Sequence, residues 1–170
     1  MIRVLILVLS LSSTLLAYSI SRSSGGMKAI VALPETYMKD KSYPVMVVLH
    51  GMRENMYHSY ARFKSSALAN DMILICPEGS DFNEAYLRTG KDDLKQIFDI
   101  LQTVKLKYSI ISNKLFLVGF SRGGNVALEL AMRYPKNFSH VISFFGFFNR
   151  STIQHYFSKH PIELWASTQF

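Results

Sequence analysis

The feature that most constrains this chain is a glycine-flanked serine that directly follows a short apolar run. Residues 119–124 read Gly-Phe-Ser-Arg-Gly-Gly, and the apolar residues 115–118 precede them. A strand that ends in Gly-x-Ser-x-Gly and continues as a helix must turn so tightly that the serine backbone is strained. A Cβ at Gly119 or Gly123 would collide across such a turn, and Gly124 completes its glycine set. The pattern predicts that Ser121 raises its hydroxyl at the carboxyl edge of a sheet as a candidate nucleophile. The other interpretation is a glycine-rich turn that only packs helix against sheet.

A second segment has the composition of a buried strand that ends in a polar loop. Residues 45–49 are apolar and run directly into His50-Gly51-Met52. Gly51 allows a backbone to come close to a bound molecule. On the serine side, the Arg122 amide opens the predicted helix, so it is oriented to donate to a developing oxyanion.

Three stretches together carry a resemblance to a known family. They are residues 43–51, the helix that starts at residues 92–94 and ends at 107–110, and residues 117–124. In these stretches the chain resembles the α/β-hydrolase superfamily, and within it the small secreted serine esterases of the polyhydroxybutyrate depolymerase and feruloyl esterase type. The likeness extends over about residues 28–165. It implies a doubly wound, mostly parallel sheet and hydrolysis of a small or polymeric carboxylic ester through an acyl-Ser121 intermediate.

The resemblance also assigns roles to the His-Gly segment. In these hydrolases the loop after the third strand forms the other half of the oxyanion hole. The donor there would be the Met52 amide, with the Arg53 amide as the less favoured choice. His50 is expected to be structural and to hydrogen-bond the loop rather than to transfer a proton.

Strand and helix patterns alternate along the chain, as expected for a parallel sheet with helices on both faces. Residues 81–90 are expected to form a loop over the site. The expected strands are 28–33, 44–49, 72–76, 115–118, 141–145 and 161–165, and the expected helices are 57–68, 94–108, 125–133 and 156–160.

A serine hydrolase of this superfamily also needs an acid and then a histidine, in that order after the serine. No Asp follows Ser121, and the residues that could substitute are poorly placed on the expected elements. We therefore expect an α/β-hydrolase domain that lacks its last strand or strands and helix, and that is nearly inactive by itself. A non-catalytic secreted binding protein with a degenerate hydrolase fold and an acyltransferase are the alternatives. The poorly placed residues are Glu129, Glu163, His140, His155 and His160.

The first residues have the pattern of a secretory signal. Arg3 precedes an apolar stretch over residues 4–17, and Ala17-Tyr18-Ser19 is a small-x-small cleavage site. We predict a signal peptide over residues 1–19, a domain over 20–170 and a secreted or periplasmic protein. The stretch is shorter than the roughly 20 residues of a membrane span. An uncleaved N-terminal membrane anchor is the alternative.

The remaining composition narrows the class of partner. The net charge is +7, but the basic residues, Arg53 and Arg62 among them, are scattered and are expected to form a solvated surface. No nucleic-acid-binding pattern accompanies them, so nucleic acid is not an expected partner. No metal-ligand spacing occurs, and no cofactor or metal is expected. The single Cys76 is expected to lie buried in a strand.

Overall fold

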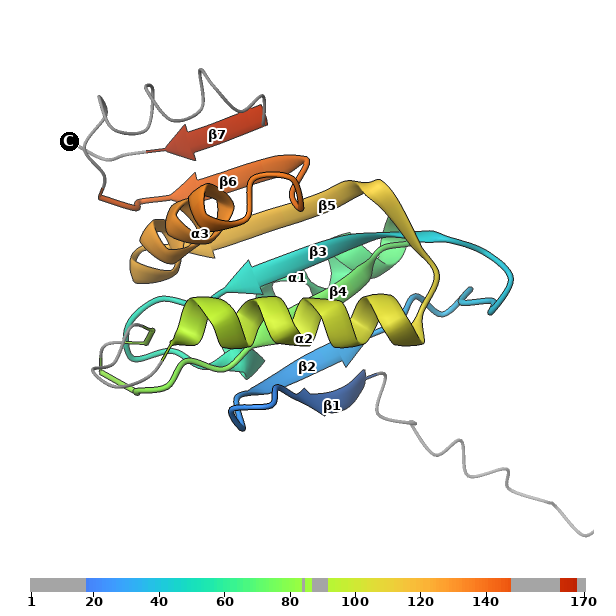
Figure 1. The fold of residues 1–170 in the computed structure, drawn as a ribbon, viewed down its shortest axis with the longest axis horizontal. Coiled ribbons are helices and arrows are strands. Elements are labelled where there is room, and N and C mark those ends of the chain that lie inside the picture. The colour runs from blue at the N-terminus through green and yellow to red at the C-terminus, as the bar shows by residue number, and fades with distance from the viewer. Residues whose placement is uncertain (1–17, 84, 87–91, 148–162, 168–170) are drawn as a thin grey trace, which may run out of the picture.

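The protein forms a seven-stranded mixed sheet with helices on both faces (Figure 1). The computed structural model describes residues 18–83, 85–86, 92–147 and 163–167, the last range by its backbone only. The strand order is β1-β2-β4-β3-β5-β6-β7; β1 and β2 run antiparallel to their neighbours, and the other neighbours are parallel. The strands are β1 (Tyr18–Arg22), β2 (Lys28–Ala32), β3 (Tyr43–Leu49), β4 (Ile73–Pro77), β5 (Ile110–Phe120), β6 (His140–Phe144) and β7 (Glu163–Ser167), and the helices are α1 (Met56–Ala69), α2 (Asp93–Lys107) and α3 (Arg122–Arg133).

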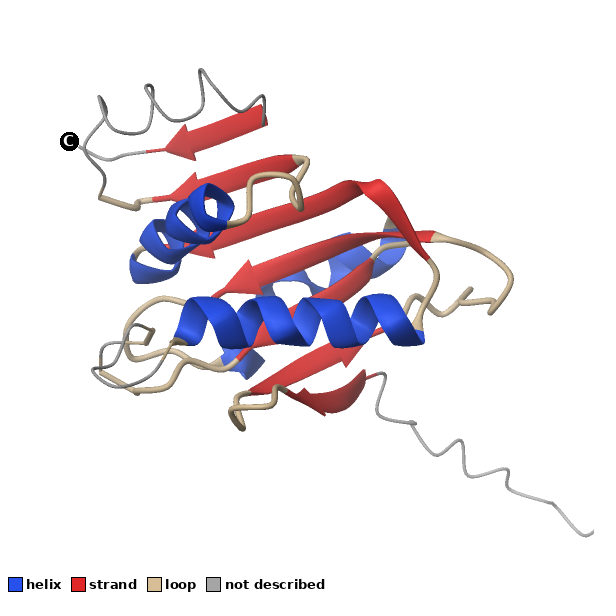
Figure 2. Ribbon diagram, viewed as in Figure 1, coloured by secondary structure: helices blue, strands red, loops and turns tan. Residues whose placement is uncertain are grey.

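Two apolar layers hold the helices to the sheet. α2 and α3 cover one face of the sheet and α1 covers the other (Figure 2). Successive residues of β3 point to opposite faces, so Val47 packs in the core under α2 and α3, and Val48 packs in the core under α1. A strand buried on both faces has the continuous apolar sequence seen here. The predicted doubly wound, mostly parallel sheet is confirmed.

The predicted elements agree with the structure over most of their length, but two of them begin three or more residues earlier than predicted and one strand was missed. β5 begins at Ile110 instead of residue 115, because the polar residues 112–114 extend the ribbon beyond the apolar part that the sequence marks. α3 begins at Arg122 instead of residue 125, because glycines that are poor helix formers open it for steric reasons described below. β1 was not predicted at all. It is a partly exposed edge strand of sequence Tyr-Ser-Ile-Ser-Arg, which has only two apolar residues and whose first two residues were assigned to the predicted signal segment.

β1 overlaps the predicted signal segment. Tyr18 and Ser19 pair with Ala32 and Val31 of β2, and the Tyr18 ring lies 4.9 Å from that of Tyr60 on α1. The predicted boundary between residues 19 and 20 thus falls inside a paired strand. The rest of the predicted signal, residues 1–17, lies outside the described residues. Within the described ranges, no helix has both the length and the apolar character needed to cross a membrane.

The register of the parallel strands defines one edge for the site. Phe120 at the end of β5 pairs with Phe144 at the end of β6, and Phe144 pairs with Ser167 at the end of β7. Ser121 and the loops that follow β3, β4 and β6 therefore meet at the carboxyl edge of the sheet. β7 is found at residues 163–167, close to the strand predicted at 161–165. The helix predicted at 156–160 lies outside the described residues.

Candidate active site

Ser121 lies in the turn between β5 and α3, with a backbone that few residues adopt. Its φ is 49° and its ψ is −118°, a conformation that costs about 1–3 kcal/mol for a non-glycine residue. Its N–H donates to the Phe144 carbonyl at 2.7 Å, and its carbonyl accepts from the Gly124 and Asn125 amides. Hydrogen bonds on both sides of the residue thus maintain the strained turn, and the side chain remains exposed.

The glycines around Ser121 are required sterically. A Cβ on Gly119 would lie 2.1 Å from the Gly123 carbonyl oxygen, across the turn. A Cβ on Gly123 would lie 2.5 Å from the carbonyl oxygens of Leu49 and His50, at the end of β3. A Cβ on Gly124 would lie 2.6 Å from Ser143 Oγ. The steric need for glycine predicted from sequence at positions 119 and 123 is present in the turn at residues 119–124, called the elbow below. The short distances at Gly123 also show that the elbow packs against the end of β3.

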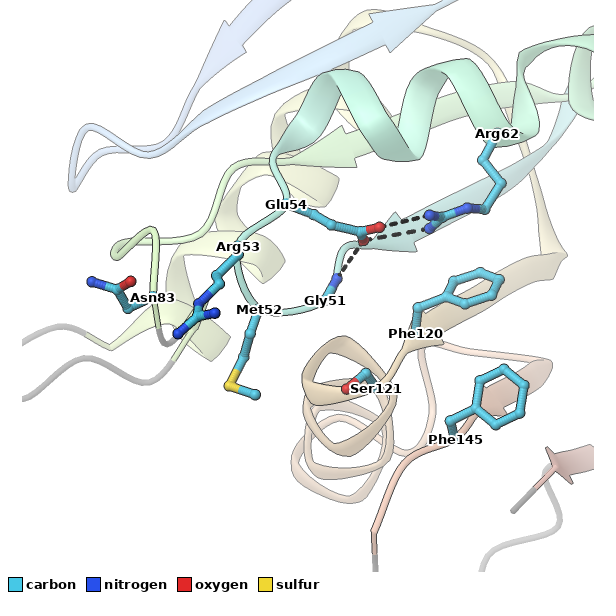
Figure 3. A pocket seen from close by; sticks show the side chains of 9 residues that line it. All are labelled: Gly51, Met52, Arg53, Glu54, Arg62, Asn83, Phe120, Ser121 and Phe145. Atoms are coloured by element: carbon cyan, nitrogen blue, oxygen red, sulfur yellow. Dashed lines mark hydrogen bonds and ion pairs between the residues drawn. The ribbon is translucent and has the colours of Figure 1, made fainter. Parts of the chain in front are cut away.

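The loop after β3, residues 50–54, lies beside the serine and is called the oxyanion loop below. A Cβ on Gly51 would lie 3.5 Å from Ser121 Cβ, which is an ordinary contact. Gly51 is therefore close to the nucleophile, but a small side chain would fit there. A cavity of about 630 Å³ opens between the loop and the elbow (Figure 3), lined by Gly51, Met52, Arg53, Glu54, Arg62, Asn83, Phe120, Ser121 and Phe145.

His50 is buried and makes contacts on both ring nitrogens. Nε2 accepts from the Gly79 N–H at 3.0 Å, and Nδ1 lies 2.8 Å from the Gly51 carbonyl oxygen. Because a backbone amide only donates and a carbonyl only accepts, the ring must be neutral with its proton on Nδ1. Burial lowers the pKa of His50, which favours the same neutral form. With both nitrogens occupied by backbone groups, His50 has the contacts expected of a structural residue.

The contacts of the Gly51 carbonyl orient the next amide. This carbonyl accepts from His50 Nδ1 and from the Glu54 N–H at 3.3 Å. In a trans peptide the C=O and N–H point in opposite directions, so the Met52 N–H is directed away from these two donors. The Arg53 N–H donates to the Phe82 carbonyl at 2.9 Å. The Arg53 amide is therefore engaged, which leaves Met52 as the donor candidate in this loop.

The second donor candidate belongs to regular structure. Arg122 is the first residue of α3, and the first amides of a helix have no partner within it. Their partial positive charge favours an anion at this position. Met52 lies in the loop that lines the cavity beside Ser121, and Arg122 follows Ser121 in the chain. That the two amides point to one spot beside the Ser121 hydroxyl remains a prediction.

Two charged residues in the cavity wall were missed by the sequence analysis. Glu54 accepts from the Gly51 N–H at 2.9 Å and from Arg62 Nη2 at 2.6 Å. Arg62 and Arg53 were expected on a solvated surface; both are exposed, and both also line the cavity, which the sequence did not indicate. The one signal in the sequence was a carboxylate three residues after the His-Gly glycine. It is weak, because an acidic residue before a helix also has an ordinary capping role.

The described residues do not supply a general base for Ser121. Three histidines lie in the described ranges, and none of them hydrogen-bonds Ser121: His50 holds backbone groups, His58 belongs to the N-terminal cap of α1, and His140 begins β6 at the opposite edge. Glu163 begins β7 at that same opposite edge. Glu129, another of the poorly placed candidates, lies within α3, where burial raises the pKa of its carboxyl group. The predicted candidates His155 and His160 lie outside the described residues.

Comparison with known proteins identifies the family of the chain. The family model Esterase, described as "Putative esterase", matches residues 21–169. The bifunctional acetylxylan esterase/xylanase XynS20E of Neocallimastix patriciarum is 26% identical over 83 residues, which make up 48% of this chain and 12% of that protein.

Solved structures show the same fold. A thermostable esterase is similar with a TM-score of 0.69 at 17% identity, over 88% of this chain and 46% of that one. A feruloyl esterase module from Clostridium thermocellum, complexed with sinapinate, has a TM-score of 0.65 at 15% identity, over 89% of this chain and 67% of that one. The fold is thus that of the α/β-hydrolases. The chain spans less than half the length of both the curated relative and the thermostable esterase.

Proposed function

Because the chain belongs to the Esterase family, we propose that it is a serine hydrolase that cleaves carboxylic esters through an acyl-Ser121 intermediate. The observation that carries this proposal is the geometry of Ser121. Its side chain is exposed at a strained turn and lines a cavity, and the Met52 and Arg122 amides, which we assign as oxyanion donors, donate to no carbonyl among the described residues.

The reaction follows from that geometry. Ser121 Oγ attacks the ester carbonyl carbon and loses its proton to a base. The carbonyl oxygen becomes an oxyanion that accepts hydrogen bonds from the Met52 and Arg122 amides. Such preorganised electrostatic stabilisation is usually the largest single contribution to the rate enhancement. Collapse of the tetrahedral intermediate breaks the ester bond, and the leaving alkoxide takes the proton. Water then attacks the acyl-serine by the same route in reverse, and the free acid is released.

We assign the base and its acid partner to a segment outside the described residues. No described histidine reaches Ser121, and the chain spans only part of its relatives. Without a base the serine is a weak nucleophile, although oxyanion stabilisation and binding alone gave roughly 10³–10⁴ over water in serine proteases. The 170-residue chain is therefore expected to be slow by itself.

The walls of the cavity favour an ester with an apolar acyl or alcohol part. The rings of Phe120 and Phe145 form one side, and the backbone of the oxyanion loop forms the other (Figure 3). The similar proteins are named for acetylxylan esters, in which the alcohol part is a polymer, and for feruloyl esters, in which the acyl part is an aromatic acid. We propose small or polymer-bound carboxylic esters as the substrate class, with transfer of the acyl group to another alcohol as the second use of the same residues.

Ester hydrolysis by two forms of the protein tests this proposal. The 170-residue chain should hydrolyse short-chain nitrophenyl esters far below roughly 1 per second, and a form extended by the segment encoded downstream should be faster by orders of magnitude. Ser121→Ala should abolish that gain. An extended form without activity, or one that Ser121→Ala leaves active, would refute the serine mechanism. A fast 170-residue chain would mean that the base lies within it, and His155→Ala and His160→Ala would then locate it.

A further inference from the structure

Glu54 and Arg62 form a charged bridge in the wall of the cavity (Figure 3). Arg62 Nη2 lies 2.6 Å from Glu54 Oε1, and Arg62 Nη1 lies 3.4 Å from Glu54 Oε2. Glu54 Oε2 also accepts from the Gly51 N–H at 2.9 Å, and the Glu54 N–H donates to the Gly51 carbonyl at 3.3 Å. Glu54 therefore holds Gly51 through both its side chain and its backbone, and α1 holds Glu54 through Arg62.

The same bridge reaches the nucleophile strand. The Arg62 guanidinium lies over the Phe120 ring, 4.6 Å from its centroid, and Phe120 immediately precedes Ser121. Phe120 packs in turn against Phe63 of α1 and Phe144 of β6. The Arg62 head group is thus in contact with both sides of the cavity, with the oxyanion loop through Glu54 and with the elbow through Phe120.

We propose that Glu54 and Arg62 are positioning residues that fix the oxyanion loop relative to Ser121, a role that rests on the proposed hydrolase function. The Glu54 carboxylate holds the Gly51 N–H, and the Glu54 N–H holds the Gly51 carbonyl, which shares its peptide plane with the Met52 N–H. The two bonds together fix Gly51 and the plane that carries the Met52 amide. The donor then has a set distance from the serine, which is the condition under which a preorganised amide stabilises an oxyanion. The pair acts through the loop and does not touch the reacting atoms.

The charge state of the pair supports this role. The Arg62 hydrogen bond lowers the pKa of Glu54, and the Gly51 amide and the nearby His58 act in the same direction, while burial opposes them. The carboxylate is thus ionised throughout the neutral range. Because the folded-state pKa is lowered, the bridge is fully present above the ordinary pKa of Glu and is lost as the pH falls through the lowered value. Its titratable and charged neighbours are Arg62 and His58 on α1 and His50 at the end of β3.

The first arm of the test needs no turnover. Amide NMR spectra of the 170-residue chain would be compared with those of Glu54→Gln, Arg62→Met and Arg62→Lys. A proton bonded to a carboxylate resonates downfield, so Glu54→Gln should move the Gly51 amide upfield and shift the Met52 amide with it. Arg62→Lys, which keeps the charge but loses the planar fork, should show a smaller change than Arg62→Met.

The second arm measures the reactivity of Ser121 toward an alkyl fluorophosphonate, which forms a tetrahedral adduct on serine. Glu54→Gln should lower the second-order rate constant by about 10- to 100-fold, less than the loss of a whole oxyanion donor. The matched control is Arg133→Met, which removes a two-point Arg133–Asp92 pair of similar exposure that does not line the cavity. It should leave the rate within about twofold.

The outcomes separate the bridge from the proposed function. Unchanged Gly51 and Met52 resonances in Glu54→Gln overturn the positioning role, whether or not Ser121 reacts. A shifted Gly51 with an unchanged Met52 and an unchanged rate also overturns it, because the bridge is then only structural. If neither the 170-residue chain nor the extended form reacts faster than its Ser121→Ala variant, the proposed function fails, and the two amide resonances still decide the bridge.

Discussion

The two proposed backbone donors beside Ser121 are placed by different means. The Arg122 amide belongs to the first turn of α3, and its position follows from the strand-turn-helix path of the main chain. The Met52 amide belongs to a loop, and its direction depends on His50 and Glu54, which hold the two sides of Gly51. The first donor is therefore determined by backbone sterics and the second by side chains, so substitutions should affect the two sides unequally.

The largest effect is expected at the elbow glycines. Gly119→Ala places a methyl group 2.1 Å from the Gly123 carbonyl oxygen, and Gly51→Ala places one no closer than 3.5 Å to any neighbour. Gly119→Ala should destabilise the chain by about 3 kcal/mol or more, whereas Gly51→Ala should cost less than about 1 kcal/mol. Urea unfolding of both variants measures the difference. Equal losses would show that the elbow and the loop do not differ in steric constraint.

The next effect is expected at His50, on the loop side. His50→Ala leaves the Gly51 carbonyl and the Gly79 N–H without their ring partner and opens a small cavity, so we expect a loss of about 3 kcal/mol in unfolding free energy. His58→Ala removes an exposed histidine that caps α1 and should cost about 1 kcal/mol or less. Chemical denaturation at pH 7.5 compares the two. A His50→Ala variant as stable as His58→Ala would contradict the role assigned to His50.

The sequence predicts the part of the site that backbone sterics determine better than the part that side-chain contacts determine. Glycine and serine spacing reports backbone sterics directly, so the elbow and its glycines could be located from residues 119–124 alone. Gly51 is held by Glu54 and His50. These two residues are bonded in turn to Arg62 on a helix and to Gly79 after another strand, and pairings over such sequence distances have no local signature. For Arg62 only solvent exposure was accordingly expected, and β1 was missed because it has just two apolar residues and overlaps the predicted signal segment.

A smaller effect should appear as a pH dependence on the loop side. Burial lowers the pKa of His50 below its ordinary value near 6.5, so the unfolded chain binds a proton more readily than the folded one. The stability that His50 contributes is therefore complete above about pH 6.5 and decreases as the pH falls below that value. Unfolding free energies from pH 8 to 5 should fall in the wild type and fall less in His50→Gln. Parallel curves would contradict a neutral, buried His50.

The smallest effect concerns the N-terminus. The predicted signal site would release a chain that begins near Ile20, which removes Tyr18 from its contact with Tyr60 and shortens β1. A chain beginning at Ile20 should be less stable than one beginning at Tyr18 by about 1 kcal/mol. Mass spectrometry of exported protein would locate the cleavage, and thermal unfolding of the two forms would give the difference. An exported protein that retains residues 1–19 would refute the signal prediction.

The most direct test of the central claim is whether the Met52 and Arg122 amides both bind the phosphonyl oxygen of an adduct formed on Ser121. Amide spectra of the fluorophosphonate adduct, recorded against the free chain, report each donor separately. We predict that the Met52 and Arg122 amide protons move downfield together, and that the Arg53 amide, which is bonded to Phe82, stays in place. An adduct in which Met52 does not move, or in which Arg53 moves in its place, would contradict the two-donor site.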